Sequence, residues 1–169
     1  MRAAAALFLT LYLLQAMVAQ VNTAIAPIHV WLFAGGLFVA YPALMMPFRP
    51  GFAAAVLGGF LCDSLAPVAF GTHAALFAAA HAVLYKMRER LQRDETAVAV
   101  SAALLVNLAL FLAVSFSRVG MAHGGGGTWP RMLSDLFWSE AVVAVITPWF
   151  FSLQLRTLEM ARAVDSGLS

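Results

Sequence analysis

Residues 51–85 read GFAAAVLGGFLCDSLAPVAFGTHAALFAAAHAVLY, and they are apolar almost throughout although they contain the acid Asp63. Small residues recur there at a spacing of four, at Gly51, Ala55 and Gly59, which places them in line with Asp63 on one face of a helix. Lines of Gly and Ala let two helix backbones approach closely within a bilayer. The stretch therefore predicts two short helices joined by a turn, with a carboxylate near their junction.

The whole chain has the composition of a polytopic membrane protein. Of its 169 residues, 63% are hydrophobic and 11% are charged, and the mean hydropathy is +0.87, whereas a soluble domain is about a quarter charged. We expect an all-α bundle of six transmembrane helices that forms a single integral membrane domain over residues 1–169. The predicted spans are residues 3–21, 28–46, 51–65, 71–85, 96–116 and 136–155.

The positions of the basic residues predict the orientation of the chain. Six spans place both termini on the same side of the membrane. That side receives eight of the ten Lys and Arg residues, whereas the other side receives only Arg118 and Arg131. Because loops rich in Lys and Arg stay in the cytoplasm, both termini are predicted to be cytoplasmic. The basic loop of this side contains Lys86, Arg88, Arg90 and Arg93.

Asp63 is the first candidate functional residue, because an acid within hydrocarbon is costly and is retained for a reason. In one interpretation it contacts a partner or a polar ligand at the outer face of the membrane. In the other it is a helix-end carboxylate that accepts hydrogen bonds from backbone N–H groups where the helix at Gly71 begins. The residues alone leave both interpretations open.

Glu140 is the second acid in an apolar run. If the last span begins near Leu136, Glu140 lies about 6 Å below that start. The simplest interpretation is an interfacial acid whose carboxylate reaches water or Arg118.

The two histidines of the fourth predicted span, His73 and His81, are eight residues apart and so point in directions about 80° apart on a helix. They do not form a metal-ligand pair, and we interpret both as polar packing residues. The chain has one cysteine, no cluster with zinc-ligand spacing, and no recognisable nucleophile with a base. We therefore expect no cofactor and no enzymatic activity.

The net charge of +2 gives no reason to expect nucleic-acid binding. The basic loop at residues 86–93 is most simply a topology signal that meets anionic lipid head groups. Docking of a cytoplasmic partner is the alternative interpretation of that loop.

The chain resembles the bacterial rod shape-determining MreD family. The resemblance rests on Gly59-Phe60-Leu61-Cys62-Asp63, followed after a short link by Gly71-Thr72-His73-Ala74, together with the chain length, the six spans and the basic loop after the fourth. The family pattern is Gly-x-x-x-Asp, a short link, and Gly-x-His-Ala at the start of the next helix. The link in this chain, residues 64–70, lacks the glycine of the family pattern.

The resemblance implies a non-enzymatic membrane subunit of the cell-wall elongation machinery, located in the bacterial cytoplasmic membrane. Its partners would be a single-span MreC-like protein, the MreB filament, and RodA with its penicillin-binding transpeptidase. The resemblance also implies a fold similar to the substrate-binding subunits of energy-coupling-factor transporters. The alternative is that the chain itself is a substrate-binding subunit of a vitamin-type transporter. Such a subunit needs convergent polar groups, for which Asp63, Glu140 and Asn107 are the candidates.

Overall fold

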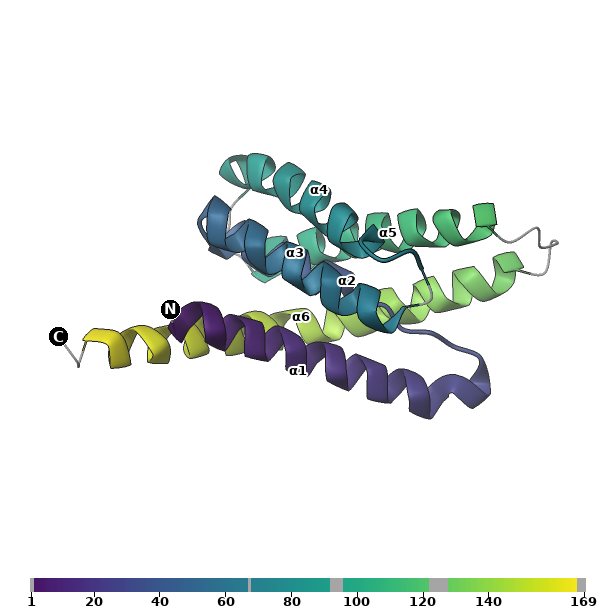
Figure 1. Cartoon of the computed structure of the whole chain (residues 1–169), viewed down its shortest axis with the longest axis horizontal. Helices are drawn as coiled ribbons and strands as arrows, with labels where there is room; N and C mark the ends of the chain where they lie inside the picture. The colour runs from purple at the N-terminus through teal and green to yellow at the C-terminus, as the bar shows by residue number, and fades with distance from the viewer. Residues whose placement is uncertain (1, 67, 92–95, 122–127, 167–169) are drawn as a thin grey trace.

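All regular elements in the described parts of the chain are helices (Figure 1). The computed structural model describes residues 2–66, 68–91, 96–121 and 128–166. For these residues, the prediction of an all-helical protein with six α-helices is confirmed. The elements are α1 (Arg2–Ile25), the short 3₁₀-helix η1 (Ala26–Ile28), α2 (Gly35–Met45), α3 (Phe48–Leu65), α4 (Thr72–Met87), the 3₁₀-helix η2 (Arg88–Arg90), α5 (Thr96–Met121) and α6 (Thr128–Ser166).

Three helical stretches within the described residues are long and apolar enough to cross a membrane: Phe8–Ile28, Thr96–Ser117 and Trp129–Thr157. They belong to α1, α5 and α6, and they are compatible with a membrane protein. The other helices are shorter or less apolar. In particular, α2 has 11 residues, which corresponds to about 16 Å along the helix axis.

Helix α2 lies at the centre of the bundle. It packs against α3, α4, α5 and α6, and every residue from Gly35 to Leu44 is buried. The ring of Tyr41 packs edge-on against Phe150 and Phe151 of α6. The ring of Phe38 lies beside Phe77 of α4, with 6.2 Å between the ring centroids. A helix that is apolar on all sides is stable only in such surroundings.

Two predicted helix starts are wrong, and the last helix ends at Ser166 rather than near Leu155. The second helix begins at Gly35 rather than near Ile28, because residues 30–34 are non-helical and the amides of residues 31–33 pair with side chains of other helices, as described below. The sixth helix begins at Thr128 rather than near Leu136. Hydropathy detects only its apolar part, whereas the amphipathic residues before Leu136 continue the same helix.

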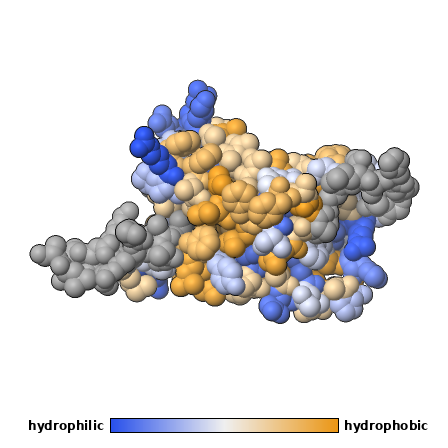
Figure 2. All heavy atoms as spheres, viewed as in Figure 1, coloured by the Kyte–Doolittle hydropathy of each residue, from blue (hydrophilic) through white to orange (hydrophobic). Residues whose placement is uncertain are grey.

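The two termini lie at the same end of the bundle (Figure 1). The turn between α2 and α3 and the 3₁₀-helix η2 lie at this end too, whereas η1 and the turn between α3 and α4 lie at the opposite end. Hydrophobic side chains cover the middle of the face shown in Figure 2, and hydrophilic ones gather mainly towards the ends. Both termini therefore lie at one end of the bundle, as was assumed when the Lys and Arg residues were assigned to the two sides.

Single-cysteine labelling should place Arg90 and Arg131 on opposite sides of the membrane. Both residues are exposed, and Cys62 is buried and so gives little background. We expect a membrane-impermeant maleimide to label Arg131→Cys in intact cells, and to label Arg90→Cys only after the membrane is opened. Labelling of Arg90→Cys in intact cells would contradict cytoplasmic termini.

Candidate functional site

The carboxylate of Asp63 joins the end of α3 to the start of α4. Its Oδ2 accepts hydrogen bonds from the backbone N–H groups of Gly71 at 3.0 Å and Ala74 at 3.2 Å. Its Oδ1 accepts from the backbone N–H of His73 at 2.9 Å and lies 2.8 Å from Nδ1 of the His73 ring. The Asp63 residue is only 4% exposed. The hydrogen bonds expected between an acid and the helix at Gly71 are therefore present, and a bond to the His73 ring adds to them.

The backbone around Asp63 explains why this geometry forms. The first turn of a helix has N–H groups without intrahelical acceptors. A carboxylate there accepts hydrogen bonds from them and interacts favourably with the positive end of the helix dipole. Gly71 precedes α4 with φ of +96°, a left-handed conformation that a residue with a Cβ adopts only at a cost. A glycine at position 71 therefore lets the chain turn sharply enough to aim three amides at one carboxylate.

Gly59 brings α3 and α4 into backbone contact below that carboxylate. A Cβ at position 59 would lie 2.6 Å from the backbone nitrogen of Ala74 and 2.8 Å from the carbonyl carbon of His73. The predicted close contact between Gly59 and the helix that begins near Gly71 is confirmed. The residues that carry the family resemblance thus touch one another and form one unit, which we call the Asp63 junction: Gly59, Asp63, Gly71, His73 and Ala74.

Both histidines of α4 are buried packing residues, as predicted. The His73 ring lies beside the rings of Phe33 and Phe77, at centroid distances of 6.0 and 6.1 Å. The His81 ring is completely buried and lies among the rings of Phe48, Phe52 and Tyr85. The described residues contain no group of three His, Cys, Asp or Glu side chains that could hold a metal ion.

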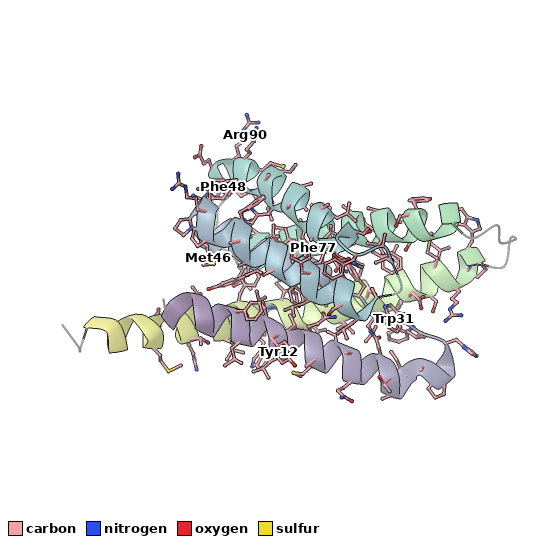
Figure 3. The ribbon with its side chains drawn as sticks, viewed as in Figure 1. Tyr12, Trp31, Met46, Phe48, Phe77 and Arg90 are labelled. Atoms are coloured by element: carbon pink, nitrogen blue, oxygen red, sulfur yellow. The ribbon has the colours of Figure 1, made fainter. Side chains whose placement is uncertain are left out.

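Arg88 is the one basic-loop residue whose described side chain is held by the fold. Its guanidinium donates to the backbone oxygen of Met46 at 2.7 Å and to the Tyr85 hydroxyl at 2.8 Å, and it stacks on the Tyr85 ring at 3.7 Å. Lys86 and Arg90 are exposed, and Arg90 extends away from the bundle (Figure 3). Arg93 lies outside the described residues.

The segment at residues 29–34, which we call the entry segment, leads into α2 without forming a helix. Side chains from two helices, α1 and α6, pair with its backbone. Asp135 Oδ1 accepts from Trp31 N at 2.9 Å, and Ser139 Oγ accepts from Phe33 N at 3.0 Å. The Asn22 amide accepts from Leu32 N at 2.7 Å and donates to Leu32 O at 2.9 Å. Because unpaired backbone amides are costly away from water, these bonds allow the segment to remain non-helical.

Glu140 has a partner inside the bundle that the interpretation of an interfacial acid reaching water or Arg118 did not include. Because α6 begins at Thr128, Glu140 lies about 18 Å along the helix from that start. Its Oε1 accepts a hydrogen bond from Asn107 Nδ2 at 3.1 Å. Asn107 Oδ1 in turn accepts from the N–H of Gly36 at 3.0 Å, so Glu140 supports the start of α2. The side chain of Arg118 lies outside the described part of the structure.

Asn22→Ala should destabilise the fold by about 1–3 kcal/mol, because it leaves the N–H and the carbonyl of Leu32 without their partners in a partly buried site. Thr23→Ala is the matched control, because its exposed hydroxyl bonds only to Ala19 O in its own helix. Thermal unfolding of the purified variants in detergent measures the difference. Equal melting temperatures for the two variants would show that Asn22 does not hold the entry segment.

A small cavity of about 70 Å³ lies between the entry segment, α1 and the ends of α3 and α4. Its polar lining includes Gln15, Asn22, His73 and Ser115. The Cys62 thiol at its edge lies 3.6 Å from Gln15 Oε1, as a weak hydrogen-bond donor. The volume is far below the roughly 300–1,000 Å³ of pockets for vitamin-sized ligands. Asp63, Glu140 and Asn107 do not converge on this cavity, since none of them lines it.

Sequence reasoning missed the residues that hold the entry segment. Asn22, Asp135 and Ser139 are separated from their backbone partners by 10, 104 and 106 positions along the chain. The available signal was the presence of short polar side chains in otherwise apolar runs. Such residues in a membrane bundle usually face a polar partner, but the sequence does not show which one.

The comparisons with known proteins return no matches. No protein-family model matches the chain, no curated protein matches it, and no solved structure matches its fold.

Proposed function

We propose that the chain is a non-enzymatic membrane subunit of the machinery that elongates the bacterial cell wall. In this role it maintains rod shape by scaffolding a single-span MreC-like protein and the peptidoglycan synthases. All six helices would lie in the cytoplasmic membrane with both termini in the cytoplasm, and the fold would be of the kind found in energy-coupling-factor substrate-binding subunits.

The observation that carries the proposal is the Asp63 junction. The motif residues that resemble the MreD pattern are scattered over two helices, yet Asp63 bonds to Gly71, His73 and Ala74, and Gly59 packs against the same turn. Because the members of the motif contact one another, they stabilise the same local structure. Here it fixes the hairpin of α3 and α4, and that hairpin ends at the side opposite the termini (Figure 1).

The scaffold role also agrees with how the buried polar groups are used. Asp63, Asn107 and Glu140 each bond to other groups of the chain. A scaffold requires a rigid bundle with defined outer surfaces, and these bonds provide rigidity. A transporter subunit would instead direct several of them into a ligand cavity.

Depletion in the source bacterium tests the proposal. Cells that lose the protein should change from rods to spheres, and the tagged protein should co-purify with the MreC-like protein. Ala53→Leu serves as a tagged control variant, because residue 53 is exposed on α3, and it should restore rods.

The alternative is a substrate-binding subunit of a vitamin-type transporter. The polar side chains of Gln15, Asn22 and His73 in the lining of the cavity beside the entry segment favour it, whereas the small volume of that cavity opposes it. Under that alternative, depletion would leave cells rod-shaped and abolish uptake of one solute. That outcome would overturn the scaffold proposal.

A further inference from the structure

An apolar groove runs between α4 and α5 and encloses about 630 Å³. Small side chains on both helices, such as Ala79, Ala80, Ala102 and Ala109, leave the space between the helices unfilled. Its lining residues extend from Leu76 to Leu91 on one side and from Ala97 to Ala113 on the other. The stretch of α5 corresponds to a length of about 24 Å.

The groove has different chemistry at its two ends. Met87 and Leu91 line it at the end that holds the basic loop. Lys86 and Arg90, which are adjacent to them in sequence, are exposed and available to a ligand. Residues 86–91 contain one acid, Glu89, and the three bases Lys86, Arg88 and Arg90, so the charge of this stretch is positive. Between Leu76 and Met87 the α4 lining is entirely apolar.

We propose that this groove binds one anionic phospholipid, with an acyl chain between α4 and α5 and its phosphate against Lys86 and Arg90. An apolar groove whose last lining residues, Met87 and Leu91, are next in sequence to exposed cations matches a molecule that is apolar along its length and anionic at one end. Basic side chains at the cytoplasmic end of transmembrane helices attract such head groups. The inference does not depend on the proposed function.

The groove suits a chain of this kind better than a partner helix. A helix with its side chains is about 10–12 Å in diameter, which is wider than a single acyl chain. A partner helix would therefore sit on the groove rather than in it and leave its floor unfilled. An acyl chain is narrow enough to reach the small side chains of the floor.

Native mass spectrometry of the purified full-length protein tests the proposal. After equal exposure to phosphatidylglycerol and phosphatidylcholine, the protein should retain one phosphatidylglycerol at least tenfold in preference to phosphatidylcholine. The double variant Lys86→Gln/Arg90→Gln should lose this preference. Ala109→Phe, which fills the groove at an exposed lining position, should lose retention of both lipids.

Ala53→Phe is the matched control for the filling variant, because residue 53 is exposed on α3 and does not line the groove. It should retain phosphatidylglycerol like the unmodified protein. Equal retention of the two lipids by the unmodified protein, or unchanged retention by Ala109→Phe, would overturn the proposal. Cross-linking of Ala109→Cys to a partner's transmembrane helix, with displacement of the lipid, would also overturn it and identify the groove as a protein interface.

Discussion

Gly59→Ala is expected to lower the melting temperature of the protein by about 2–12 °C, and Gly59→Leu to prevent accumulation of folded protein. An added Cβ would lie 2.6 Å from the backbone nitrogen of Ala74, and backbone cannot move aside as a side chain can. Overpacking typically costs about 1–3 kcal/mol, and about 2–4 °C accompanies each kcal/mol in a chain of this size. Thermal unfolding in detergent, followed by size-exclusion chromatography, measures both variants.

Gly58→Ala is the control for this prediction. Position 58 is also buried, but its added Cβ would meet the side chain of Phe38, with Cδ1 at 2.8 Å, rather than backbone. A ring can rotate, so we expect a smaller loss of stability. If Gly59→Ala melts at the temperature of the unmodified protein, the close contact between α3 and α4 does not contribute to stability.

Asp63→Leu should leave the protein unfolded or absent from the membrane. It removes the acceptor of the Gly71, His73 and Ala74 amides and of the His73 ring. A buried donor without an acceptor costs about 1–3 kcal/mol, so the sum approaches the total stability of an ordinary domain, about 5–15 kcal/mol.

Asp63→Asn should give a folded protein of intermediate stability, because each carboxylate oxygen accepts two bonds and the amide replaces one oxygen with a donor. If the NH₂ group faces His73, the imidazole can change its tautomer and accept, but the His73 amide loses its partner. The expected loss is about 1–3 kcal/mol. In membrane fractionation and thermal unfolding, the unmodified protein should be the most stable, Asp63→Asn intermediate and Asp63→Leu the least stable.

Ser64→Ala is the matched control, because that exposed hydroxyl donates only to Leu61 O within its own helix. It should behave like the unmodified protein. A folded Asp63→Leu variant of normal stability would show that the Asp63 junction does not order α4.

The sequence was informative where the signal is local. The helices over residues 51–65, 71–85 and 96–116 are each found within α3, α4 and α5 or one residue outside them, because a continuous apolar run bounded by glycine, proline or charged residues defines such elements. The Asp63 bonds were also accessible, since the acid and the start of α4 are separated by one short turn.

The sequence was uninformative where partners are distant in the chain. Residues 29–34 are apolar enough to be part of a span, and no local feature indicates that their amides bond to Asp135 and Ser139. The same holds for Glu140, whose partner Asn107 is on another helix. Hydropathy ranks residues by cost of transfer and carries no information on which polar groups meet.

The entry segment has a consequence for how the chain is made. Its amides are satisfied by Asp135 and Ser139, which the ribosome adds roughly a hundred residues later. Until then, the entry segment lacks the two hydrogen-bond acceptors that α6 supplies. The entry segment therefore acquires its complete set of hydrogen bonds only after α6 has been synthesised.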